Sequence, residues 1–178
     1  MRRLVVLGCA GITLLTSAVA SASEGQWHLG GGLGAATFAK VDSGYAPNLN
    51  LQAAYELDDM FDVSLELSAA QFSFVEGTTT RFYGAMAGVL YKVDVIEWVP
   101  YFGLYGGYFS FDGPIWPAPL NKQELGIAVP LGLDYSFSRS FAAGAQIRYH
   151  GFMSDPMSSL SDAPYFVAQL RAEYRWGF

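Results

Sequence analysis

The chain has 178 residues, of which 10 are Lys or Arg and 16 are Asp or Glu, and its formal net charge is −6. This acidic balance, without a basic stripe, argues against nucleic-acid binding. Hydrophobic residues make up 52% of the sequence and aromatic residues 16%, and the single cysteine, Cys9, lies in the N-terminal segment. Once that segment is removed, the chain can form neither a disulfide nor a thiolate metal site.

Residues 1–22 have the pattern of a cleaved signal peptide. Arg2 and Arg3 give a positive start, an apolar stretch follows, and small residues at alternate positions precede cleavage after Ala20 or Ala22. The apolar stretch is too short, and too often interrupted by glycine, for a transmembrane helix. We therefore expect an exported protein with one domain, residues 23–178.

The first half of that domain contains four segments in which apolar and polar residues alternate. In the third segment, for example, Val63 and Leu65 alternate with Ser64 and Glu66. A period of two is typical of a β-strand with one apolar and one polar face. A tight turn is predicted at Asp58. The four predicted strands are 27–39, 45–57, 61–74 and 80–93.

Three further strands are predicted at 99–111, 124–137 and 141–153. The first is apolar on both faces, so its orientation stays open. The second carries Pro130 in its middle, where a strand residue normally donates its N–H to a neighbouring strand. Because proline has no N–H, we expect a bulge or a local distortion at this position.

The last segment, 165–178, alternates apolar residues such as Phe166 and Leu170 with Gln169, Arg171 and Glu173. It ends with three aromatic residues at alternate positions. This ending resembles the C-terminal signal by which bacterial outer-membrane barrels are recognised for insertion. The residues of the predicted membrane-insertion signal are Tyr174, Trp176 and Phe178.

Together the segments predict an all-β fold, an eight-stranded antiparallel up-and-down transmembrane β-barrel. Short and longer connections alternate, as expected if both termini and the short turns face the periplasm. Aromatic residues near the strand ends predict two interfacial girdles. The periplasmic girdle would contain Trp27, Tyr55, Phe61, Tyr91, Trp98, Tyr101, Phe137, Phe141, Trp176 and Phe178, and the outer girdle Tyr45, Tyr83, Phe109, Tyr149 and Phe166.

The polar face of the strands would line a narrow lumen, where buried charges must be paired. We predict an interior polar plug formed by Glu66, Arg148, Arg171 and Glu173, in which the two glutamates pair with the two arginines. A plug that holds the barrel shape is favoured over a narrow ion path, because eight strands leave little free lumen.

His150 is the one candidate for catalysis, because serines and aspartates follow it in the next connection. Small barrels that remove acyl chains from lipid A carry a His followed two residues later by Ser. Here Phe152 breaks that pattern. We therefore interpret His150 as an interior or rim residue and predict no catalytic residue, no metal site and no cofactor.

Over residues 25–178 the chain resembles the small outer-membrane β-barrel proteins, a group that includes the outer-membrane protein A-like and X-like barrels. The resemblance implies a Gram-negative outer membrane, contact with its lipids and lipopolysaccharide, and assembly by periplasmic chaperones and the barrel-assembly machinery. A structural or surface-interaction role is expected. The alternatives are a narrow solute or ion channel, a lipid A-modifying enzyme, and a soluble lipocalin-like barrel with its apolar face inward.

Overall fold

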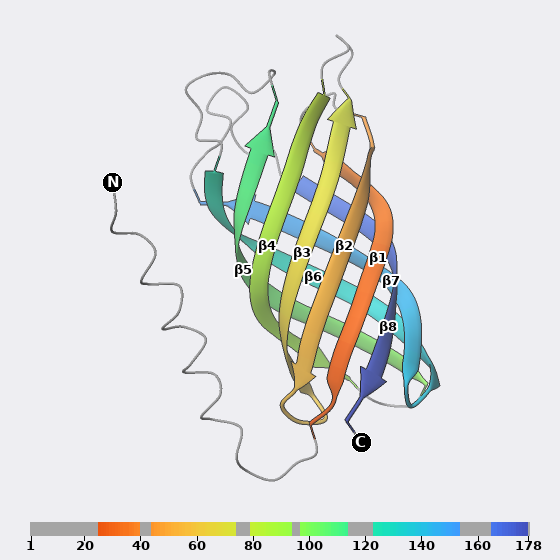
Figure 1. The fold of residues 1–178 in the computed structure, drawn as a ribbon. Coiled ribbons are helices and arrows are strands. Elements are labelled where there is room, and N and C mark those ends of the chain that lie inside the picture. The colour runs from red at the N-terminus through yellow and green to blue at the C-terminus, as the bar shows by residue number, and fades with distance from the viewer. Residues whose placement is uncertain are drawn as a thin grey trace.

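The computed structural model describes residues 25–39, 44–73, 79–93, 97–113, 123–153 and 165–177. They form eight antiparallel strands in one closed barrel, in which neighbours in the chain pair and β1 also pairs with β8 (Figure 1). The predicted all-β barrel is thus confirmed. The strands are β1 (Trp27–Phe38), β2 (Ala46–Glu56), β3 (Phe61–Ser73), β4 (Thr79–Lys92), β5 (Trp98–Asp112), β6 (Gln123–Ser138), β7 (Phe141–Phe152) and β8 (Tyr165–Trp176).

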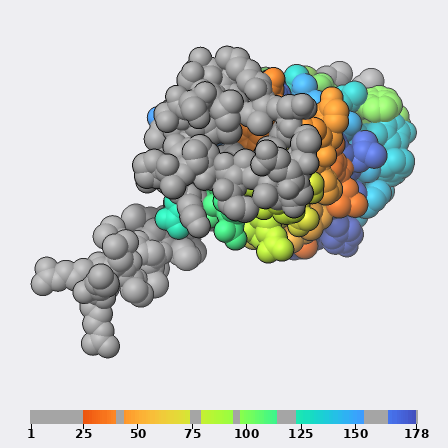
Figure 2. Space-filling model, turned by 90° about the horizontal axis from the view of Figure 1, so that it is seen from above, coloured from red at the N-terminus to blue at the C-terminus, as the bar shows by residue number. Residues whose placement is uncertain are grey.

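Closure of the barrel brings the first and last strands side by side (Figure 2). At the start of β1, Trp27 pairs with Trp176 of β8. The strands are tilted. Following paired residues from His28 once around the barrel leads back to β1 at Phe38. A closed sheet needs this stagger, which makes each strand cross the barrel wall obliquely.

The barrel has two distinct ends. The start of β1 and the end of β8 lie together with the turn after β2, and we call this the turn end (Figure 1). In that turn, as predicted, the Asp58 carboxylate accepts hydrogen bonds of 2.8 Å from the backbone N–H groups of Met60 and Phe61. The opposite end, where β1 finishes at Phe38 and β8 begins at Tyr165, is the loop end.

The apolar face of the strands points outward and the polar face inward. Leu33 is 68% and Leu170 71% exposed, whereas Glu66 and Arg148 are 2% and 1% exposed. A soluble lipocalin-like barrel requires the reverse arrangement, so that alternative is wrong. No helix among the described residues is long and apolar enough to cross a membrane.

The structure shows which face of β5 points into the barrel, a question that the sequence left open. Tyr101, Tyr105 and Phe109 point into the barrel and are at most 3% exposed. The assignment of Tyr101 and Phe109 to the aromatic girdles is therefore wrong. The girdles themselves are present, because Trp27, Trp98 and other aromatic residues are exposed near the turn end, and Tyr83 and Tyr149 near the loop end.

Pro130 is accommodated without a bulge. The β6–β7 ladder pairs Pro130 with Arg148 in register, and its only shift lies between Ser136 and Ser138. On the other side, β5 and β6 pair at Phe102–Leu131 and again at Tyr105–Ala128, and the pairs between them are missing. The predicted distortion is thus a short interruption of one ladder, which is what a missing N–H causes.

Two interior tyrosines lie against glycines of neighbouring strands. A Cβ atom on Gly132 would overlap the ring of Tyr101, and a Cβ atom on Gly88 would overlap Tyr105. In both cases the tyrosine is the direct cross-strand partner of the glycine. The missing side chains therefore provide the space in which large rings lie flat inside a narrow barrel.

Candidate functional site: the barrel interior

The middle of the lumen is crossed by an ion pair between opposite walls. Both terminal nitrogens of Arg148, on β7, donate to the carboxylate of Glu66, on β3, with Nη2 to Oε2 at 2.6 Å. Gln146 Oε1 accepts from Arg148 and from Gln169 Nε2, the latter at 2.7 Å. This two-pronged pairing satisfies charges that burial would otherwise make costly.

The other two predicted plug residues lie on β8, closer to the turn end. Arg171 donates to Glu173, and its guanidinium carbon lies 4.9 Å from the centroid of the Tyr101 ring. Glu173 also accepts from Arg175 Nε at 2.7 Å, and Asp134 Oδ2 lies 3.7 Å from Arg171 Nη1. The structure thus brings Glu66 to Arg148 and Glu173 to Arg171, in two groups at successive levels.

The two groups are connected through Tyr101. Its hydroxyl accepts a 3.2 Å hydrogen bond from Gln146 Nε2, and Gln146 in turn contacts Arg148. Sequence reasoning missed this role of Tyr101, because the apolar pattern of its strand does not say which face points inward. A signal was available in Gly132, whose position directly across from Tyr101 leaves room for an inward ring.

A third charged group lies at the turn end. Lys92 Nζ is 2.8 Å from Asp62 Oδ1 and 3.0 Å from Glu56 Oε2, and His28 lies 3.6 Å from each of the same two carboxylates. A pocket of about 500 Å³, lined in part by Lys92 and Glu56, opens here. Within the described ranges, no group of three or more His, Cys, Asp or Glu side chains could hold a metal ion.

The lumen at the loop end is filled by aromatic side chains. Phe82 and Tyr165 rings are 4.6 Å apart, Phe38 and Phe72 rings 5.0 Å, and the Phe82 ring lies 5.2 Å from that of Phe111. We call this group the aromatic cluster, and it consists of Phe38, Phe72, Phe82, Phe109, Phe111 and Tyr165, all at most 4% exposed. The sequence predicted no such cluster, and it placed Phe109 in the outer girdle instead of the lumen.

His150 lies at the inner side of the aromatic cluster. Its ring is 4.7 Å from that of Tyr165 and 5.6 Å from that of Phe109, and the residue is 1% exposed. It makes no hydrogen bond to a side chain that the structure describes. The serines and aspartates of the following connection lie outside the described residues, as does Phe178 of the predicted insertion signal.

The other two residues of that signal point outward at the turn end. Tyr174 is 55% and Trp176 40% exposed, and their rings stack with centroids 6.0 Å apart. They lie at the level of the aromatic girdle of the turn end, where Trp27 pairs with Trp176. An apolar exterior between two aromatic girdles, around a polar interior, defines a transmembrane β-barrel.

The sequence places this barrel in a family. The model of the outer membrane protein beta-barrel domain matches residues 7–175, and the chain belongs to that family. Membership assigns the protein to the outer membrane of a Gram-negative bacterium. No curated protein sequence matches the chain significantly.

Solved structures share the fold at low sequence identity. Neisserial surface protein A has a TM-score of 0.64 and 16% identity, covering 89% of this chain and 99% of that chain. OprG from Pseudomonas aeruginosa has a TM-score of 0.59 and 15% identity, covering 86% and 97%. The outer membrane enzyme PagL has a TM-score of 0.53 and 8% identity, covering 82% and 97%. Such similarity shows the fold and transfers no activity.

Proposed function

We propose that this protein is a non-enzymatic outer-membrane barrel with a structural or surface-interaction role and a lumen closed to solutes. The observation that carries the proposal is the double obstruction of the lumen. The Arg148–Glu66 pair crosses it at mid-height, and the aromatic cluster fills it at the loop end. An interior filled by side chains gives shape and rigidity to the barrel and leaves no path for a hydrated ion.

The geometry around His150 supports a role other than catalysis. A general base needs a nucleophile within hydrogen-bond reach. When the base is a histidine, a further group must also orient its ring. The neighbours of His150 are aromatic rings, and the cluster separates it from bulk water at the loop end. We infer that His150 is a packed interior residue and that the protein lacks lipid A-modifying activity.

The proposal includes the placement of both termini in the periplasm. The connections at the turn end are short and those at the loop end are mostly longer, which is the usual arrangement for bacterial barrels. It also includes contact with outer-membrane lipids and lipopolysaccharide, and assembly by periplasmic chaperones and the barrel-assembly machinery. Recognition would involve Tyr174, Trp176 and Phe178.

The experiment that tests the closed lumen is conductance in planar lipid bilayers. The refolded barrel should give no stepwise current in KCl solution at either polarity, whereas a known porin measured in the same way provides the positive control. Folding before reconstitution is verified by gel mobility of unheated samples. Reproducible single-channel steps from folded protein, absent after heating, would establish the narrow channel and overturn the proposal.

A further inference from the structure

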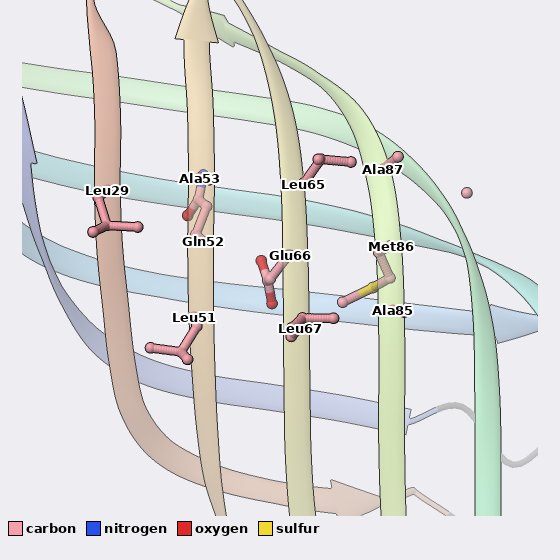
Figure 3. Close-up of a pocket in the computed structure, with 11 residues that line it drawn as sticks. Leu29, Leu51, Gln52, Ala53, Leu65, Glu66, Leu67, Ala85, Met86 and Ala87 are labelled. Carbon is pink, nitrogen blue, oxygen red and sulfur yellow. The ribbon is translucent and has the colours of Figure 1, made fainter. Parts of the chain in front are cut away.

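The outer face of β1 to β5 carries an apolar groove. Two adjoining hollows, of about 590 and 410 Å³, share Leu51, Leu67 and Ala85 among their lining residues. Figure 3 shows the residues that line the first of these hollows. Small outward side chains, Ala85 and Ala87 on β4, line the groove together with leucines of β2 and β3. A hydrocarbon chain in this groove would contact protein atoms on several sides. It would therefore gain more dispersion energy than it would on a convex part of the barrel wall.

The groove extends over most of the apolar band. Toward the turn end it reaches Leu29, two residues from the girdle residue Trp27. Toward the loop end it reaches Tyr83, Tyr108 and Ser110, whose hydroxyl groups lie at the level of the outer girdle. Its apolar length therefore ends at groups that can hydrogen-bond to a lipid head group.

A positive charge lies just beyond this polar end. Arg81 is exposed on the same outward face of β4, two residues from Tyr83. Its cross-strand neighbour is Asp112, yet Arg81 makes no ion pair with any residue that the structure describes. The other described Lys and Arg residues of the strands point into the barrel, namely Lys92, Arg148, Arg171 and Arg175.

An exposed arginine at the lipid-facing end of a strand can bind a phosphate, since its guanidinium forms paired hydrogen bonds with phosphate oxygens. An apolar groove, hydroxyl groups and a guanidinium, in this order toward the loop end, match the order of acyl chain, sugar and phosphate in a phosphorylated glycolipid. The loop end is the outer end under the proposed function, and lipopolysaccharide occupies that leaflet.

We propose that the groove on β1 to β5 is a binding site for lipid A, with one acyl chain against Ala85 and Ala87 and a phosphate at Arg81. The assignment rests on the proposed function, because only an outward loop end meets the lipopolysaccharide leaflet. It adds to that function a defined lipid ligand and a defined side of the barrel.

The test is a lipid A titration of the detergent-purified full barrel, followed by native mass spectrometry. Ala85→Leu with Ala87→Leu fills the groove with apolar side chains and should weaken binding roughly tenfold or more. Ala168→Leu with Ala172→Leu makes the same change on β8, at the opposite side of the barrel, and should leave binding unchanged. Arg81→Gln should weaken binding of phosphorylated lipid A more than that of dephosphorylated lipid A.

Equal affinity of the wild type and the two leucine variants would overturn the lipid site. Dimers that disappear only when the groove is filled would also overturn it, in favour of a second copy of the chain. A separate experiment tests the orientation of the barrel, on which the proposed function depends. Met153→Cys and Asp59→Cys are labelled in intact cells with an impermeant maleimide, and labelling of Asp59→Cys alone would show that the loop end faces inward.

Discussion

At the scale of single residues, the interior is defined by how its charges are satisfied. Arg148 and Glu66 are almost fully buried on opposite walls, and each would be costly to bury without the other. The pair is also bonded to Gln146, which links it through Tyr101 to the Arg171 group. The buried charges thus form a connected network that fixes the relative positions of β3, β5, β7 and β8.

The network predicts a strong asymmetry between single and double substitutions. Arg148→Met should lower the free energy of unfolding by about 3–5 kcal/mol, because it leaves the Glu66 carboxylate buried without a partner. Glu66→Gln combined with Arg148→Met removes both charges and should recover most of that loss. Urea unfolding of the barrel in lipid vesicles measures both values. Equal losses in the single and double variants would show that the pair is not the source of the effect.

At the scale of elements, glycines decide how β4, β5 and β6 fit together. Inward rings at Tyr101 and Tyr105 lie over Gly132 and Gly88, so the strands can approach although large side chains occupy the lumen. The interrupted β5–β6 ladder at Pro130 lies in the same region. Here the local sequence departs from an ideal strand, and the neighbouring strands compensate without a register shift.

Two alanine substitutions of glycine test this packing. Gly132→Ala should destabilise the barrel by about 1–3 kcal/mol, because the new methyl group displaces the Tyr101 ring in a filled interior. Gly106→Ala, on β5, is the matched control. A Cβ there meets nothing within 4 Å, so its effect should stay within about 0.5 kcal/mol. The same urea unfolding assay compares them, and similar losses in both would contradict the role of Gly132.

At the scale of the whole molecule, the barrel has three layers along its axis. Charged groups lie at the turn end, the Arg148 network lies at mid-height, and the aromatic cluster lies at the loop end. Closure leaves no sheet edge among the described strands, which suits a protein surrounded by lipid, where unpaired backbone groups are costly.

A closed barrel of this type should stay folded in detergent until it is heated. Full-length protein expressed in a Gram-negative host should occur in the outer-membrane fraction and change its gel mobility on boiling. Trp176→Ala combined with Phe178→Ala should lower the folded yield, whereas Phe137→Ala, another exposed aromatic at the turn end, should have a smaller effect. Soluble periplasmic protein without a mobility change would contradict the membrane barrel, and equal yields would contradict the insertion signal.

The sequence alone determined the strands, their number and, on every strand except β5, which face points inward, because a period of two is a local property of the chain. It also identified Glu66, Arg148, Arg171 and Glu173 as inward charges, since alternation places them opposite the apolar residues. It did not decide which face of β5 points inward, where both faces are apolar, and it therefore misplaced Tyr101 and Phe109.

Only the tertiary structure decided which charges meet. Arg148 and Glu66 are far apart in the chain and come together because closure places β3 and β7 on opposite walls at a level set by the strand stagger. The aromatic cluster and the outer groove have the same origin, since each is assembled from several strands. Contacts across a closed barrel depend on its stagger as a whole, and no single segment of sequence contains that information.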